Sequence, residues 1–310
     1  MHFDLNPVVS TAGDPGGFYP PTGTPDRMEV SERVRGLVEL TRLGNAVGAG
    51  VLTFIGAFVA IGLPAGPDRV HVGVAIGATV IATGAGNAIN DYFDREIDAI
   101  NAPDRPIPRG AVTPRSALAF SVVLFGGAIG LALTLPSLAI LIAVINLAAL
   151  VTYTEVFKGL PGAGNVVVGY LGGSTFLFGA ASVERLSTTA IVLFLLAAVS
   201  TVTREIIKDV EDIEGDREEG LRTLPIAIGE RRALAIGGAL LVAAVVASPL
   251  PWILGTLGVA YLALVVPADG IMLYALAESF EDPTDGQKHI KIGMFLAAAS
   301  FVVGRSLLLL

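Results

Sequence analysis

Long apolar runs constrain this chain more than any other feature of its sequence. Of its 310 residues 53% are hydrophobic and 15% are charged, whereas a soluble domain carries about 25% charged residues. Backbone polar groups cannot stay unpaired in lipid, so runs that cross about 30 Å of hydrocarbon must be helical. We therefore predict an all-α, polytopic membrane protein, a nine-transmembrane-helix bundle with spans near 44–63, 71–91, 115–134, 137–153, 163–181, 188–208, 232–249, 253–276 and 291–309.

The distribution of lysine and arginine predicts how this bundle is oriented. With a cytoplasmic N-terminus, 17 of the 20 basic residues lie on the inner side, Arg69 and Arg185 lie in outer loops, and Arg305 lies in the last span. Inner loops of membrane proteins carry the excess of Lys and Arg. We expect a multi-pass protein of the cell membrane whose long loops, 92–114 and 209–231, are cytoplasmic and whose C-terminus is outside.

The N-terminal segment, the net charge and the absence of cysteine indicate the domain organisation and the kinds of partner. Residues 1–34 predict a disordered N-terminal tail, which leaves 35–310 as a single transmembrane domain. The net charge of −8 suggests a halophile with a salt-rich cytosol, although codon bias combined with functional aspartates is an alternative. The absence of cysteine excludes disulfides and thiolate metal sites. We expect the lipid bilayer as the surroundings, no nucleic acid, and no obligate protein partner.

Two aspartate clusters repeat the same spacing at the ends of the second and sixth predicted spans. Both read Asp-x-x-Asp-x-x-x-Asp, and matching aspartates are offset by 118 residues. Similar segments, 105–109 and 222–226, follow the two clusters. This self-similarity predicts a duplicated four-helix unit. The aspartates are Asp91, Asp94 and Asp98 in the first cluster and Asp209, Asp212 and Asp216 in the second.

The spacing of these acids has a chemical meaning. On a continuous helix Asn90, Asp94 and Asp98 lie within about 80° of arc, and the three acids of the second cluster within about 60°. Like charges at this spacing repel, which is tolerable where divalent cations lie between them. Mg²⁺ prefers oxygen ligands and binds one or two carboxylates together with substrate phosphates. We predict Mg²⁺ sites that hold a diphosphate; the alternative is a pair of acidic, solvated helix ends.

Basic residues lie among these acids. Cationic donors stabilise the charge that develops on a diphosphate leaving group, so we predict a diphosphate-binding role for four of them, although each also fits an ordinary topology signal. They are Arg109, Lys158, Arg204 and Lys208.

The motifs resemble those of the UbiA superfamily of intramembrane prenyltransferases, over roughly residues 35–310. The first family motif, Asn-x-x-x-Asp-x-x-x-Asp, matches Asn90, Asp94 and Asp98; the second, Asp-x-x-x-Asp, matches Asp212 and Asp216, with Asp209 upstream. The resemblance implies a nine-helix bundle whose central cavity opens sideways to lipid beneath two aspartate-rich loops. It also implies catalysis with Mg²⁺ held by Asn90 and these aspartates.

Three stretches, 39–47, 204–216 and 288–294, look like the branch of the superfamily that makes archaeal ether lipids. This likeness implies transfer of a geranylgeranyl group from geranylgeranyl diphosphate to the sn-2 hydroxyl of geranylgeranylglyceryl phosphate. Asp91 would be a further metal ligand or a general base. Arg42 and Asn45 lie where the first predicted span leaves the cytoplasm and would bind the acceptor; for Arg42 the alternative is an ordinary topology signal near a helix start.

Two alternatives stay open at this point. The same motifs suit transfer to another acceptor, such as an aromatic quinone precursor, a porphyrin or a carotenoid. A cation-coupled transporter would also use intramembrane acids, but near the bilayer midplane, whereas both clusters lie at helix ends. Asp269, inside an apolar span, either lines the cavity or is reached by water.

Overall fold

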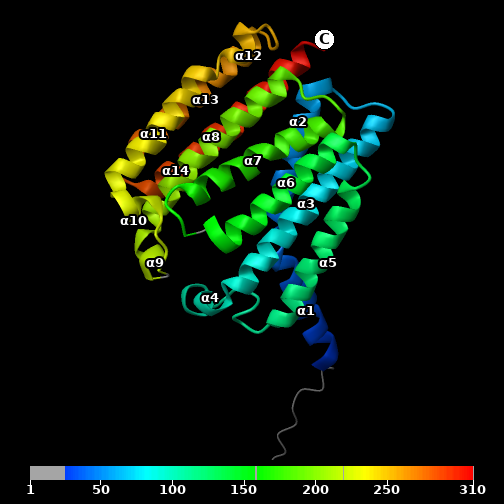
Figure 1. Cartoon of the computed structure of the whole chain (residues 1–310), viewed down its shortest axis with the longest axis vertical. Helices are drawn as coiled ribbons and strands as arrows, with labels where there is room; N and C mark the ends of the chain where they lie inside the picture. The colour runs from blue at the N-terminus through cyan, green and yellow to red at the C-terminus, as the bar shows by residue number, and fades with distance from the viewer. Residues whose placement is uncertain (1–24, 158, 219, 310) are drawn as a thin grey trace, which may run out of the picture.

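The computed structural model describes residues 25–157, 159–218 and 220–309, and every regular element in these ranges is a helix (Figure 1). The long helices are α1 (Pro25–Leu40), α2 (Leu43–Ile61), α3 (Pro67–Phe93), α5 (Pro114–Ala132), α6 (Ser137–Thr152), α7 (Ala163–Ser182), α8 (Thr188–Glu211), α11 (Glu230–Ala247), α13 (Val259–Glu278) and α14 (Pro283–Leu307). The short ones are α4 (Arg95–Asn101), α9 (Ile213–Glu218), α10 (Leu224–Ile228), α12 (Leu250–Ile253) and a π-helix, Tyr153–Phe157.

The prediction of an all-α, multi-pass membrane protein is confirmed. Seven of the described helices are long and apolar enough to cross a bilayer. Helix α6 is apolar but shorter, at 16 residues, and α7 is a 20-residue helix rich in glycine. Each of the nine predicted spans falls on one helix, but length and composition do not confirm the count of nine.

Two predicted boundaries differ from the structure for local reasons. The eighth span was expected from residue 253, but α13 begins at Val259 because Gly255, with φ +66°, turns the chain before it. The ninth was expected from residue 291, but α14 begins at Pro283. There the Asp282 side chain accepts a hydrogen bond from the Asp285 N–H at 3.0 Å and caps the helix.

The predicted disordered tail, residues 1–34, is partly wrong. Its first 24 residues lie outside the described residues, whereas 25–34 belong to α1. Pro25 is the first residue of this helix, a position that suits proline. Leu37 and Leu40 pack α1 against the bundle near Ile107 and Val112, so tertiary contacts support a helix that composition alone did not predict.

The two halves of the chain present the same order of elements. Helices α2, α3, α4, α5 and α6 are matched in order by α7, α8, α9, α11 and α13. The first-half break between α3 and α4 at Asp94 recurs between α8 and α9 at Asp212. The duplication remains a prediction, and the helix order is compatible with it.

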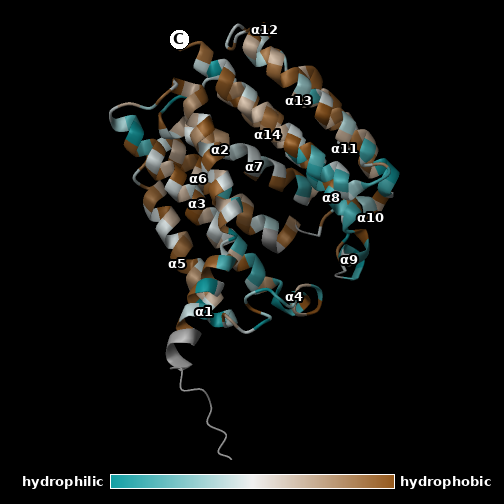
Figure 2. Ribbon diagram, turned by 180° about the vertical axis from the view of Figure 1, so that it is seen from behind, coloured by the Kyte–Doolittle hydropathy of each residue, from teal (hydrophilic) through white to brown (hydrophobic). Residues whose placement is uncertain are grey.

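The motif loops lie at one end of the bundle. Figure 1 places α1, α4 and α9 at this end and the C-terminus at the opposite end. Figure 2 shows hydrophilic residues gathered around α4, α9 and α10, while hydrophobic residues cover the long helices. This is the distribution expected when the helices lie in lipid and the loops in water.

Close contact between α2 and α7 joins the two halves. A Cβ on Gly179 of α7 would overlap the carbonyl oxygen of Thr53 on α2, and a Cβ on Gly56 would overlap that of Phe176. Helices in lipid associate largely through such close packing, because there is no hydrophobic drive between them. Both helices line the central chamber described below, so this contact sets its width.

We therefore expect Gly179→Ala to destabilise the protein by about 1–3 kcal/mol, because the added methyl group must push two backbones apart. The measurement is the thermal unfolding of purified protein in detergent. Gly126→Ala in α5 is the matched control, since an added Cβ there meets no atom within 4 Å. Equal melting temperatures for the two variants would contradict the tight α2–α7 contact.

Candidate active site

Each aspartate motif is divided by a break in its helix. Asp94 separates α3 from α4 with φ −83° and ψ 2°, and Asp212 separates α8 from α9 with φ −92° and ψ 7°. The hydrogen-bond ladder resumes at once, from Asp98 N–H to the Asp94 carbonyl at 2.8 Å and from Asp216 N–H to the Asp212 carbonyl at 2.9 Å. The expectation that the acids of each motif lie on one face of a continuous helix is therefore wrong in detail. Each motif bends at its middle aspartate.

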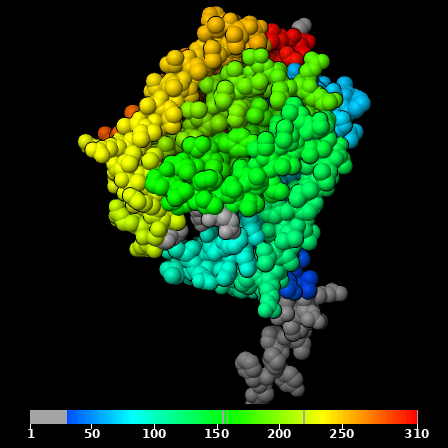
Figure 3. Space-filling view, in the orientation of Figure 1, coloured from blue at the N-terminus to red at the C-terminus, as the bar shows by residue number. Residues whose placement is uncertain are grey.

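The two motifs approach each other around Tyr153. This residue begins the π-helix beyond the end of α6, outside the membrane-spanning segment. Burial, together with the carboxylates of Glu205, Asp209 and Asp94, raises the pKa of its phenol to about 12. Carboxylates from both motifs therefore lie close enough to Tyr153 to affect the pKa of its phenol. Figure 3 shows the surface hollowed between α4 and α9 at this end.

Arginines balance the charge of the first motif. Asp91 is 4% exposed, and its Oδ1 lies 2.6 Å from Nη2 of Arg42 and 3.7 Å from Nη1 of Arg105. Asp98 is 6% exposed and accepts a hydrogen bond of 2.5 Å from Arg105. Burial alone lowers the pKa of Arg105, but the hydrogen bond that Arg105 donates to Asp98 and the nearby carboxylates raise it. Both buried acids therefore have a cationic partner.

The junction of α1 and α2 is attached to this motif. Arg42 occupies the left-handed region, with φ 45° and ψ 58°, which few non-glycine residues adopt. Asn87 of α3 donates a hydrogen bond to the Thr41 carbonyl at 2.8 Å. The strained turn is thus held by Asn87 and Asp91, one helical turn apart on α3.

The second motif has a different set of partners. Asn165 of α7, 6% exposed, donates a hydrogen bond of 2.7 Å to Oδ2 of Asp209. Nζ of Lys208 lies 3.2 Å from Oδ2 of Asp212. A neutral amide therefore holds Asp209, which is half-buried, where two arginines hold Asp91.

Asn165 was not predicted from the sequence, although a signal for it exists. Asn45 is the third residue of α2 and follows Gly44, and Asn165 is the third residue of α7 and follows Gly164. Their separation of 120 residues is close to the 118-residue offset of the aspartates. Extending the repeat upstream from the motifs would have identified this asparagine.

The other predicted residues are distributed as follows. Arg109 contacts Glu39 of α1 at 2.5 Å and donates to the Asp104 carbonyl at 2.8 Å; its hydrogen bond and that of Arg35 lower the pKa of Glu39. Arg204 pairs with Glu205. Lys158 lies outside the described residues, and Asn90 is half-buried on the last turn of α3.

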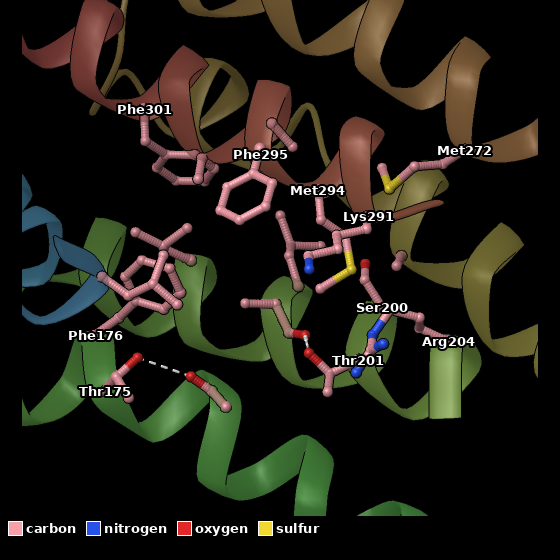
Figure 4. A pocket seen from close by; sticks show the side chains of 18 of the residues that line it. Thr175, Phe176, Ser200, Thr201, Arg204, Met272, Lys291, Met294, Phe295 and Phe301 are labelled. Carbon is pink, nitrogen blue, oxygen red and sulfur yellow. Dashed lines mark hydrogen bonds between the residues drawn. The ribbon is translucent and has the colours of Figure 1, made fainter. Parts of the chain in front are cut away.

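A chamber of about 530 Å³ extends from this end into the bundle, which is within the usual range for a small-molecule site. Figure 4 shows Arg204 and Lys291 toward one side and the rings of Phe176, Phe295 and Phe301 toward the other. Asn45 also lines it, and so does Asp269, which confirms one of the two interpretations of that acid. Its wall is formed by residues of α2, α7, α8, α11, α13 and α14, together with Ser248.

The donor set suits Mg²⁺ but does not form a complete site by itself. Within the ranges 25–157, 159–218 and 220–309, no group of three His, Cys, Asp or Glu residues is close enough to hold a metal ion. Mg²⁺ rarely uses an all-protein cage; it needs one or two carboxylates, water and substrate phosphates. Oxygen ligands from two facing motifs, with no thiolate or imidazole among them, fit that requirement.

The model of the UbiA prenyltransferase family matches residues 49–299 of the chain. The chain belongs to the UbiA prenyltransferase family. The resemblance found in the two motifs is thereby confirmed, and a bundle containing a chamber beneath two aspartate-rich loops is the architecture which that resemblance implied.

Archaeal digeranylgeranylglyceryl phosphate synthases are among the relatives of this chain. The chain is 63% identical to digeranylgeranylglyceryl phosphate synthase of Natronomonas pharaonis over 88% of this chain and 98% of that protein. It is 57% identical to the synthase of Haloquadratum walsbyi over 88% and 95%. The sources of these relatives agree with the salt-rich setting predicted from the acidic composition.

Solved structures of this family share the fold. A structure of digeranylgeranylglyceryl phosphate synthase is 35% identical, with a TM-score of 0.77, over 88% of this chain and 99% of that chain. A UbiA homologue from Archaeoglobus fulgidus bound to GPP and Mg²⁺ is 18% identical, with a TM-score of 0.64, over 89% and 99%. The second likeness concerns the fold alone.

The contacts of Asp91 predict a structural role that Asp212 lacks. Asp91→Ala leaves Arg42 without its buried partner, whereas Arg105 keeps Asp98. We expect a loss of about 2 kcal/mol in the free energy of unfolding, since removing one member of a buried pair leaves the other uncompensated. Asp212 is exposed, so Asp212→Ala should change stability by no more than about 0.5 kcal/mol. Thermal unfolding of both variants measures this difference, and an unchanged melting temperature for Asp91→Ala would disprove the assigned role.

Proposed function

We propose that this protein transfers a geranylgeranyl group from geranylgeranyl diphosphate to the sn-2 hydroxyl of geranylgeranylglyceryl phosphate, with Mg²⁺ as cofactor. The observation that carries the proposal is that the two aspartate motifs lie at the same end of the bundle as the cationic end of a largely apolar chamber. The identity of 57–63% to two archaeal digeranylgeranylglyceryl phosphate synthases supports this choice of substrates.

In this proposal the motif residues bind the diphosphate end of the donor. Asn90 and the aspartates of both motifs hold Mg²⁺, which supplies charge stabilisation for the leaving diphosphate. Asn165 orients Asp209 for this task, as outer hydrogen bonds commonly orient metal ligands. Lys208, beside Asp212, and Lys158 donate to the diphosphate. The ligand residues are Asn90, Asp94, Asp98, Asp209, Asp212 and Asp216.

Asp91 and Asp98 have an additional task, because both are bound by arginines. Asp91 holds Arg42 at the α1–α2 junction and so positions the start of α2, from which Asn45 faces the chamber. A role for Asp91 as general base would require it to leave Arg42. Arg109 positions the loop after the first motif through its contact with Glu39.

The chamber wall governs the second half of the reaction. Ionisation of the allylic C–O bond produces a cation that water would capture. Phe176, Phe295 and Phe301 provide apolar surface for the prenyl chain and exclude water from this region. The diphosphate leaves with the electron pair of the broken C–O bond, the acceptor hydroxyl forms the new C–O bond, and its proton passes to the departing diphosphate.

We expect Asp94→Ala and Asp212→Ala to reduce transfer to background, because each removes a carboxylate from the diphosphate-binding end. The assay uses purified protein, labelled geranylgeranyl diphosphate, Mg²⁺ and the acceptor. Glu96→Ala is the matched control: this acid belongs to α4, outside the motif pattern, and its side chain is 86% exposed. Near-normal transfer by either aspartate variant would contradict the metal assignment.

The same assay separates the remaining candidates. A panel containing an aromatic quinone precursor, a porphyrin and a carotenoid tests the other acceptors directly. A cation-coupled transporter has less support, because the clustered acids lie at helix ends rather than at mid-depth, and flux into liposomes tests it.

For orientation, we infer that the N-terminus and both motif loops are cytoplasmic and the C-terminus is outside. The supporting observations are the excess of basic residues on the motif side and the position of the C-terminus at the opposite end of the bundle. Both substrates then enter from the cytoplasmic side of the membrane.

The absence of cysteine makes this orientation simple to test. We expect Ala65→Cys, in the turn between α2 and α3, to react with a membrane-impermeant maleimide in intact cells. Glu214→Cys in α9 should react only after the membrane is opened. The unsubstituted chain is the control for background, and the reverse pattern would invert the assignment.

A further inference from the structure

Two cationic side chains enter the chamber from different helices. Arg204 projects from α8 and Lys291 from α14, and Figure 4 shows both directed toward the same part of the chamber. Asn45, from the start of α2, lines the same chamber. The amide and the two cations therefore belong to three separate helices.

A cation within a membrane-spanning helix is costly, so its presence inside a bundle ordinarily indicates a function. Arg204 is partly balanced, since it pairs with Glu205 and its Nη1 lies 3.4 Å from Oε1 of Gln287. A guanidinium has five N–H donors, which leaves Arg204 with donors for a ligand. Among the described residues, nothing pairs with the ammonium of Lys291, so this part of the chamber has an unbalanced positive charge.

The three groups lie at the motif end of the chamber. Arg204 precedes Asp209 by five residues on α8, about 7.5 Å along the helix axis. Gln287 donates to Glu211 at 3.0 Å, so the first turns of α14 lie beside the second motif. Lys291 is one helical turn beyond Gln287.

The acceptor's own chemistry requires an anion site at this depth. In geranylgeranylglyceryl phosphate the phosphate and the sn-2 hydroxyl are attached to adjacent carbons, so the phosphorus lies within about 5 Å of the reacting oxygen. The phosphate must therefore be held near the diphosphate end while the prenyl chain extends along the apolar wall. A neutral acceptor would need no such charge.

We propose that Arg204 and Lys291, with the amide of Asn45, form the binding site for the phosphate of the acceptor, a phosphate monoester attached to a lipid alcohol. This assignment rests on the proposed prenyl transfer and adds where the acceptor headgroup is bound. It assigns Arg204 to the acceptor rather than to the donor diphosphate, and it gives Lys291 a role that the motifs do not indicate.

The test compares Lys291→Gln and Arg204→Gln with the unsubstituted protein in binding and in transfer. Binding of geranylgeranylglyceryl phosphate, and of geranylgeranylglycerol without the phosphate, is followed by the thermal stabilisation each produces. Transfer is followed by KM for acceptor and donor separately. Lys288→Gln is the matched control, because Lys288 lies on the same helix, is exposed, and pairs only with Asp285 at 2.9 Å among the described residues.

We expect each chamber variant to weaken binding of the phosphorylated acceptor by about tenfold or more, the usual effect of removing a charged hydrogen-bond partner. KM for that acceptor should rise to match, while binding of geranylgeranylglycerol and KM for the donor stay unchanged. Lys291→Arg should restore most of the affinity. Lys288→Gln should behave like the unsubstituted protein.

Three results would overturn the subsite: unchanged affinity for the phosphorylated acceptor, equal losses for the acceptors with and without phosphate, or a rise in KM for the donor alone. A rise in KM for the donor alone would instead support the expectation that Arg204 binds the donor diphosphate. If Arg204→Gln fails to fold, Lys291→Gln decides the question, since the Lys291 ammonium has no partner to lose among the described residues. Absence of transfer by the unsubstituted protein would instead refute the proposed function, and the binding measurements would still judge the subsite.

Discussion

The arrangement of the active end depends on how buried carboxylates are balanced. Asp91 and Asp98 lie almost fully buried at the end of α3 and in α4, where isolated charges would be costly. Arg42 and Arg105 supply the compensation. Because Arg42 comes from the α1–α2 junction and Arg105 from the loop after α4, these contacts also connect three parts of the chain. The contacts that balance the charge of the buried acids therefore also set the position of α2.

The two aspartate motifs differ in the groups that balance their negative charge. The first has arginines, which keep their positive charge and bind two acids together. The second has Asn165 at Asp209 and Lys208 at Asp212, so the half-buried Asp209 accepts from a neutral donor. Two segments with the same spacing therefore provide chemically different ends of one site. A divalent cation meets less competing positive charge at Asp209 than at Asp91.

The chamber combines two environments that membrane enzymes need together. Aromatic and aliphatic side chains provide surface for a prenyl chain, and cations near the motif end provide for phosphate groups. Deeper in the chamber, Asp269 accepts a hydrogen bond of 2.5 Å from Ser248, so a neutral donor satisfies this buried acid. The close contact of α2 with α7 fixes the wall on one side, so the volume available to substrates depends on glycines far from the chemistry.

The sequence by itself determined the class of fold, the family and the identity of the acidic residues. Apolar runs long enough to span a bilayer can only be helices in lipid. The aspartate pattern repeated at a fixed offset is visible in the sequence, so both features could be recognised without coordinates. Only the tertiary structure decided which residues compensate these acids, because the pairs Arg42–Asp91 and Asn165–Asp209 join helices far apart in sequence. It also decided that Lys291 faces the chamber and that 25–34 are helical. Helix packing decides which way a side chain points and which residues it contacts. A one-dimensional pattern does not specify how helices are rotated against each other.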